Sequence, residues 1–216
     1  MGQAVTSQSL GPRDAGGAAP AFLVRHDEHL QPRAAVLGHA YGAPGHDVFL
    51  LTRASMVDRW PELGNAPETV RVVELGLLLA RTARSLGGHA TPGGHRPRPA
   101  VPPSPRAVLL ARELEPGWRR PDPWRLLAAP AARPLRALVH LDPLARDLAV
   151  LRWLDVPQAD AAAELGLAGP DLAGRLDDAM RQWAAVTEAA EQAAGGQGPG
   201  GRGPRGPGPG GQGVGR

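Results

Sequence analysis

The chain has 216 residues, with 24 basic residues against 21 acidic ones and no cysteine. This length allows one medium domain or two small ones, and the lack of cysteine excludes disulfides and cysteine-based metal sites. Every basic residue is arginine, which we interpret, together with the heavy use of Ala, Gly and Pro, as the coding bias of a GC-rich bacterial genome.

The N-terminal residues 1–20 are small and polar, and we expect them to be disordered. They lack the continuous apolar stretch of a secretory signal peptide. The most apolar run, residues 70–83, is interrupted by charged side chains and is too short to span a bilayer. We therefore expect a soluble cytoplasmic protein without membrane insertion.

Residues 21–87 are predicted to form a first helical lobe. Their seven arginines and seven acidic residues leave no net charge, and they carry most of the apolar residues of the first half of the chain. No sustained alternation of apolar and polar residues is present anywhere in the chain, so strand signals are weak. The sequence therefore predicts an all-α fold.

Residues 88–133 are predicted to be a linker rich in proline and arginine. The stretch "GHATPGGHRPRPAVPPSPR" contains many helix breakers, and only 107–114 has the character of a short helix. Trp118 and Trp124 lie beside arginines in this linker. Two alternatives stand for them: packing against a helical lobe, or docking on polymerase or single-stranded DNA, where stacking and charge act together.

Residues 134–194 are predicted to form a second helical lobe with three helices. Asp142 and Pro143 are a typical helix start, a second helix begins near Pro157 and stops at Gly166, and the last begins near Pro170. The residues expected to face inward are Leu144, Leu148, Leu151, Leu154, Ala161, Ala162, Leu165, Leu172, Leu176, Ala179, Met180 and Trp183. This order is typical of a helix-turn-helix, and a generic small helical bundle is the alternative.

Residues 195–216 form a tail of glycine, proline and arginine, which we expect to be disordered because it offers too little apolar surface to bury.

The stretch "LVHLDPLARDLAVLRWLDVPQADAAAELGLAGPDLAGRLDDAMRQW" (138–183) resembles the fourth conserved region of sigma factors. The likeness is greatest to the extracytoplasmic-function (ECF) group. The spacing from Leu-Gly to Arg-Leu is its most specific part. The matching positions are Leu141, Pro143, Arg146, Leu151, Arg152, Leu165, Gly166, Leu172, Arg175, Leu176 and Ala179.

The first lobe is similar, more loosely, to the second conserved region of the same family. The stretch "LTRASMVDRW" (51–60) fits that region's second helix, with Met56 and Trp60 at its anchor positions. Phe49 and Leu50 stand where the family has acidic residues, and the third helix lacks the family's Trp and Asn. The basic, aromatic patch that opens promoter DNA in the family is also missing.

This resemblance implies a protein that binds RNA polymerase core and promoter DNA and that an anti-sigma factor can regulate. It implies no catalytic residue and no cofactor. The DNA-binding positions carried over from the family are Asp171, Ala173, Gly174, Arg175 and Arg181, and the candidate polymerase contacts are Arg53, Arg59 and Trp60.

The charge of the last helix departs from the family pattern. Asp171 replaces the usual Thr, while Ala173 and Asp178 stand where basic residues are usual. Since phosphate neutralisation supplies most nonspecific DNA affinity, we expect independent promoter reading to be weakened or lost. Three hypotheses follow: a working ECF-type sigma factor, a sigma-like regulator that binds a protein partner without reading DNA, and a helical interaction module unrelated to transcription.

Neither a metal site nor an enzyme is expected. His26 and His29 lie three positions apart, but a metal site needs further converging ligands, so scattered surface histidines are the simpler interpretation. The sequence shows no glycine-rich phosphate loop after a strand and no nucleophile elbow.

Overall fold

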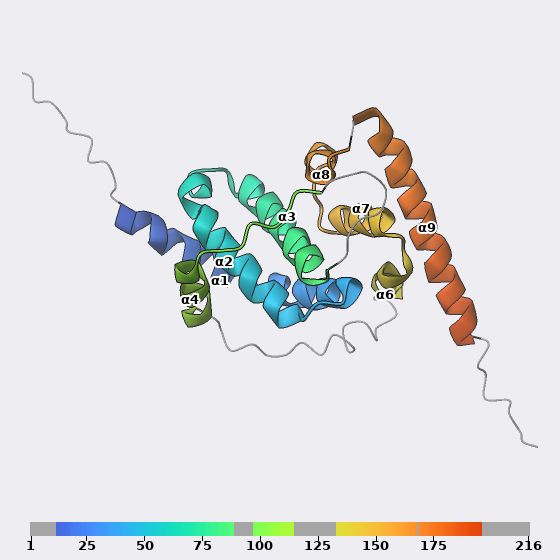
Figure 1. Cartoon of the computed structure of the whole chain (residues 1–216), viewed down its shortest axis with the longest axis horizontal. Helices are drawn as coiled ribbons and strands as arrows, with labels where there is room; N and C mark the ends of the chain where they lie inside the picture. Colours follow the sequence, from blue (N-terminus) through green and yellow to red (C-terminus); the bar gives the residue numbers. More distant parts are fainter. Residues whose placement is uncertain (1–11, 89–96, 115–132, 168, 196–216) are drawn as a thin grey trace, which may run out of the picture.

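The computed structural model describes residues 12–88, 97–114, 133–167 and 169–195. Within these ranges every regular element is a helix, which confirms the predicted all-α class (Figure 1). In chain order the elements are α1 (Pro12–Tyr41), α2 (Gly45–Leu63), α3 (Glu68–Leu86), α4 (Pro105–Glu113), α6 (Arg133–Ala137), the 3₁₀ turn η2 (Leu138–His140), α7 (Pro143–Trp153), α8 (Gln158–Leu165) and α9 (Gly169–Gly195).

Helices α1, α2 and α3 pack together as an N-terminal unit (Figure 1). A Cβ atom on Gly38 would lie 2.7 Å from the carbonyl oxygen of Ala43, and one on Gly45 would lie 2.9 Å from the Cα of Ala35. Only glycine therefore allows the end of α1 and the start of α2 to approach this closely. The interior of the unit is apolar and includes Phe22, Leu37, Phe49, Met56, Trp60 and Leu79.

Helix α1 begins earlier than the sequence predicts. Its first residue is Pro12, inside the stretch expected to be disordered, and Ala19 is already part of the core. The expected disorder of residues 12–20 is therefore wrong. Small residues such as alanine give a weak apolar signal in the sequence, yet they suit the close packing of helices.

The C-terminal unit contains α6, η2, α7, α8 and α9, and its local signals behave as predicted. The Asp142 carboxylate caps α7 by accepting a hydrogen bond from the Ala145 amide at 2.9 Å. Gly166 ends α8 in the left-handed conformation, with φ of 65°. Most of the predicted inward residues are buried; those only partly buried are Leu144, Leu176, Met180 and Trp183.

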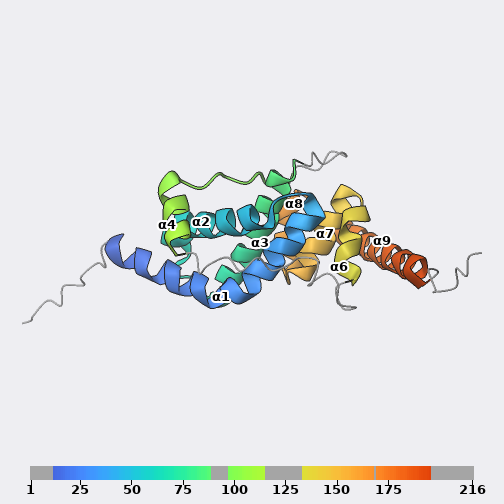
Figure 2. The same cartoon turned by 90° about the horizontal axis from the view of Figure 1, so that it is seen from below.

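The two predicted lobes are in direct contact. Their buried apolar residues form one continuous cluster, in which α3 lies against α7 and α1 lies against η2 (Figure 2). Leu154 and Val156, which follow α7, approach Gly76 in the middle of α3. The lobes are therefore joined by a packed interface in addition to the chain between them.

Part of the predicted linker is ordered against the N-terminal unit. Helix α4 confirms the short helix expected near 107–114, and it packs on α2 through Ala54, Ala107 and Ala111. The linker tryptophans Trp118 and Trp124 lie outside the described residues, as does the tail beyond Gly195. In the described part of the chain, no helix combines the length and the apolar character that crossing a bilayer requires.

We expect Gly38→Ala to lower the free energy of unfolding by about 1–3 kcal/mol, because the new methyl group would overlap backbone atoms that cannot move aside. Gly174→Ala is the matched control, since a Cβ there meets nothing within 4 Å. This second change should stabilise α9 by about 0.5–1 kcal/mol. Urea unfolding of both variants measures the difference, and equal effects would contradict the close approach of α1 and α2.

Candidate functional site

The five candidate DNA-binding positions share the exposed face of the first half of α9. This helix runs along the outer edge of the molecule, on the opposite side of α7 from α3 (Figure 1). Leu172 and Ala179 point into the core and hold the helix in place. The exposed positions are Asp171, Ala173, Gly174, Arg175 and Arg181.

The charge on this face is unfavourable for binding phosphates. Asp177 and Asp178 are also exposed, so three carboxylates including Asp171 accompany two arginines. Arg181 forms an ion pair with Asp178. Arg175 is exposed and has no ion pair with any residue in the described ranges, so it is the one cation of this set available to an external anion.

Arg53, a candidate polymerase contact, lies in the core. Its side chain is 0% exposed and pairs with Asp27 at 3.0 Å. Its guanidinium also donates to the carbonyl of Leu114 at 3.0 Å, which fixes the end of α4 against α2. The position leaves no atom of Arg53 for an external partner, so its prediction as a polymerase contact does not fit the structure.

Trp60 and Arg59 are adjacent in sequence but differ in their exposure to solvent. Trp60 is 2% exposed and packs its ring against Phe22, with 5.3 Å between ring centroids. It is therefore a core anchor and offers no surface to polymerase. Arg59 is partly exposed and pairs with Glu62 and Glu74. Of the three candidate polymerase contacts, Arg59 alone reaches the surface.

Sequence reasoning missed a buried ionic network between the two units. Glu164 of α8 has a side chain that is 0% exposed, and it lies 2.7 Å from Arg81 and 3.4 Å from Arg84, both on α3. Arg81 also pairs with Glu74 at 3.3 Å. Burial makes each of these charges dependent on its partner, because neither ion can recover its hydration while the units remain packed.

A second part of the network lies where α1 meets α7. The Asp147 carboxylate accepts a hydrogen bond from the Tyr41 hydroxyl at 2.5 Å and pairs with Arg84 at 3.0 Å. Burial and the adjacent Asp147 raise the pKa of Tyr41 well above its usual value, so the phenol remains a donor. Arg146 donates to the carbonyls of Ala40 and Leu141, both at 3.1 Å.

Arg146 matches the family pattern in sequence, and its role in the structure is to hold α1 and α7 together. The signal that could have found the network is weak. Asp147 and Glu164 are the acidic residues within otherwise apolar faces of their helices, and such positions are rarely buried without a partner. The sequence alone does not say which arginines complete the pairs.

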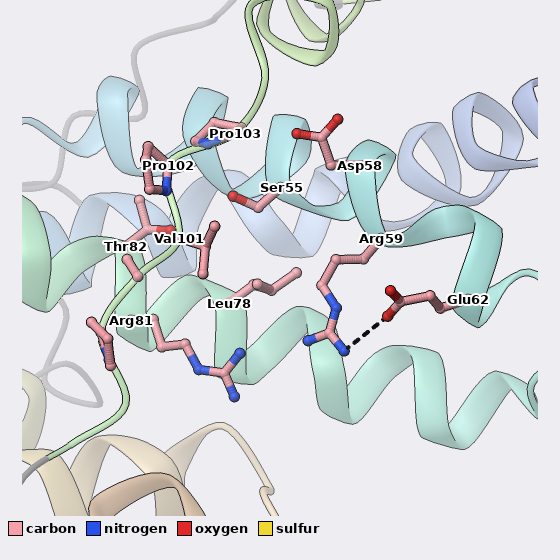
Figure 3. Close-up of a pocket in the computed structure, with 12 residues that line it drawn as sticks. Ser55, Asp58, Arg59, Glu62, Leu78, Arg81, Thr82, Val101, Pro102 and Pro103 are labelled. Carbon is pink, nitrogen blue, oxygen red and sulfur yellow. Dashed lines mark ion pairs between the residues drawn. The ribbon is translucent and has the colours of Figure 1, made fainter.

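A cavity of about 290 Å³ lies between α2, α3 and residues 99–103 (Figure 3). Its walls come from α2 and α3, and residues 99–103 form its roof. Arg59 and Arg81 both reach this cavity. The residues that line it are Ser55, Asp58, Arg59, Glu62, Leu78, Arg81, Thr82, Pro99, Ala100, Val101, Pro102 and Pro103.

The histidines give no metal site in the described ranges, where no three His, Asp or Glu side chains are placed to hold an ion. His26 is partly buried beside Glu68, while His29 is exposed.

Comparisons of the chain with protein-family models, with curated proteins and with solved structures found no match in any of the three. The likeness to ECF sigma factors therefore rests on the residues quoted above.

We expect Glu164→Gln to lower the free energy of unfolding by about 3–5 kcal/mol, since two arginines would remain buried with less compensating charge. Asp178→Asn is the matched control, because its ion pair with Arg181 is exposed. That change should cost less than about 1 kcal/mol. Chemical denaturation of both variants measures the costs, and similar small values would show that the network contributes little to stability.

Stability should also fall at mildly acidic pH. Burial lowers the pKa of His39 from its ordinary value of 6.5, and the nearby Arg136 and His140 lower it further. His39 therefore binds a proton more tightly in the unfolded chain than in the folded one. The stability that neutral His39 contributes is complete above pH 6.5 and is lost as the pH falls.

We therefore expect Tm to be lower at about pH 5.5 than at about pH 7.5, and the difference to shrink in His39→Gln. His29→Gln, at an exposed position, is the control and should leave the Tm difference between the two pH values unchanged. Thermal melts followed by circular dichroism measure it. An equal pH dependence in His39→Gln and the parent protein would rule out this role for His39.

Proposed function

We propose that this chain is a sigma-like regulator of transcription initiation that binds a protein partner, RNA polymerase core first of all, without reading promoter DNA on its own. The support from sequence is the likeness of residues 138–183 to the fourth sigma region, one linker after a helical unit similar to the second region. The arrangement of α7, α8 and α9, with its turn at Gly166, is compatible with that likeness.

The acidic face of α9 is the reason that we propose a protein partner in preference to DNA. Asp171, Asp177 and Asp178 project from the half of α9 that would have to approach phosphates. Each missing contact between a cation and a phosphate lowers the salt-dependent affinity for DNA. A carboxylate at that position also repels the phosphate. A surface of this charge suits a protein better than a nucleic acid.

A second candidate function is promoter reading within the polymerase complex. Arg175 is exposed and has no ion pair within the described ranges, and Gly174 beside it leaves the backbone open. Attachment to polymerase would raise the local concentration of DNA around α9, so contacts too weak to act alone would still be made. Under this alternative the chain contacts promoter DNA only when it is attached to polymerase, whereas an independent DNA-binding protein would do so alone.

The first experiment is an affinity pull-down of the tagged full-length chain from cells of its source, read by quantitative mass spectrometry. We expect the polymerase β and β′ subunits to be enriched, and Arg59→Ala to reduce their enrichment because Arg59 is the exposed member of the predicted contact set. Arg175→Ala is the control and should leave polymerase enrichment unchanged. Enrichment of one other protein without polymerase would reject polymerase as the partner.

The DNA part of the proposal has its own test. We expect the parent protein to bind a fluorescent duplex of about 30 base pairs only weakly, and Asp177→Arg with Asp178→Arg to tighten binding by about tenfold at low salt. Fluorescence anisotropy at two salt concentrations measures both. Tight, sequence-specific binding by the parent protein alone would contradict the proposal and favour an independent sigma factor.

A further inference from the structure

The segment 97–114 lies across the outer side of the N-terminal unit (Figure 2). Its first part, residues 97–103, is called the strap here, and α4 follows it. The strap crosses over the groove between α2 and α3, where it roofs the cavity of about 290 Å³ (Figure 3). This part of the predicted linker therefore covers the groove that Arg59 lines.

The strap covers the groove without filling it. Val101 is 79% exposed, although it is the largest apolar side chain of the strap. Residues 99–103 form no hydrogen bond to α2 or α3 within the described ranges. Beneath them, Ser55 and Thr82 are buried residues whose hydroxyls make no hydrogen bond with the described residues. Between its two ends, the strap would therefore lose little apolar contact and no backbone hydrogen bond if it moved away from the groove.

The strap is attached at its two ends. At one end the Arg98 amide donates to the carbonyl of Glu164 at 2.9 Å. At the other end Ser104 donates to the Asp58 carboxylate twice, from its amide at 2.5 Å and from its hydroxyl at 2.7 Å. Hydrogen bonds to a charged acceptor are stronger than neutral ones. The pair of Ser104 and Asp58 is therefore the stronger attachment.

Helix α4 shares Ser104 with the strap, because the Ser104 hydroxyl also caps α4 by accepting from the Ala107 amide, but α4 has further contacts of its own. Its Ala107 and Ala111 pack on Leu50 and Ala54 of α2, and Arg53 donates to the Leu114 carbonyl. The strap can therefore open while α4 stays in place. Pro99, Pro102 and Pro103 restrict the strap's backbone, so it should move as one stiff piece.

We propose that the strap is a latched cover over the α2–α3 groove, and that the hydrogen bonds from Ser104 to Asp58 are its latch. Closed, it limits access to Arg59 and the groove. Released from Asp58, it opens them to a protein partner. This inference rests on the proposed function in one respect, namely that the surface around Arg59 meets polymerase.

The chain offers a direct test because it contains no cysteine. Ser55→Cys places a single thiol beneath the strap with little change in size. The rate at which a maleimide attached to a polyethylene glycol chain modifies that thiol reports how often the groove is open to a large molecule. In this background we expect Asp58→Ala to raise the rate by about tenfold to a hundredfold, as the loss of a charge-assisted pair predicts.

Ser104→Glu is the second variant, because its added negative charge opposes Asp58, and it should raise the rate in the same direction. Glu62→Gln is the matched control: Glu62 lines the same cavity, is 74% exposed and pairs with Arg59 instead of the strap. The control should react at the parent rate. Equal rates in the parent, Asp58→Ala and Ser104→Glu proteins, all with unchanged Tm, would overturn the latch.

Binding to purified polymerase core separates this inference from the proposed function. We expect Asp58→Ala to bind polymerase more tightly than the parent protein, by a factor similar to the increase in thiol reactivity. If thiol reactivity rises but no variant binds polymerase, the latch stands and the proposed function fails. If polymerase binds the parent and Asp58→Ala proteins equally well, the cover does not control access and the inference is wrong.

Discussion

The arrangement of this molecule depends on the buried charges between its two helical units. Glu164 and Asp147 belong to the C-terminal unit, and both pair with arginine on α3. A buried ion pair adds little to stability compared with an apolar contact of the same size, but it tolerates only one geometry. The network therefore fixes how α8 and α7 sit on α3, and apolar contacts such as those around Gly76 supply the adhesion.

This fixed arrangement defines two surfaces with different character. The exposed face of the first half of α9 bears three carboxylates and two arginines, of which Arg175 has no ion pair within the described ranges, so its charge is unfavourable for binding phosphates. The face of α2 carries Arg59 beside a cavity, under a stiff segment held at its ends. The proposed function assigns partner binding to the surface at α2 and no independent DNA reading to α9.

The features predicted correctly are local ones. The cap at Asp142 and the stop at Gly166 depend on residues within one turn of each other, and the sequence contains that information. The placement of Arg53 failed because its partner Asp27 lies on a different helix, and a pattern of residue types does not distinguish a solvated arginine from a buried one. The buried ionic network was not predicted at all, for the same reason, since Arg84 and Glu164 are 80 positions apart in the sequence. Long-range pairing is a property of the packed fold.

The absence of lysine gives the interface between the units a particular character. A buried lysine can release its proton and become neutral when its partner leaves, which lets an interface loosen by degrees. Arginine keeps its charge, so Arg81 and Arg84 must be hydrated as full cations before α8 can move away from α3. Partial opening would separate both from Glu164 before water could replace it. We therefore expect the two units to be either packed together or fully separated, with partly opened arrangements disfavoured.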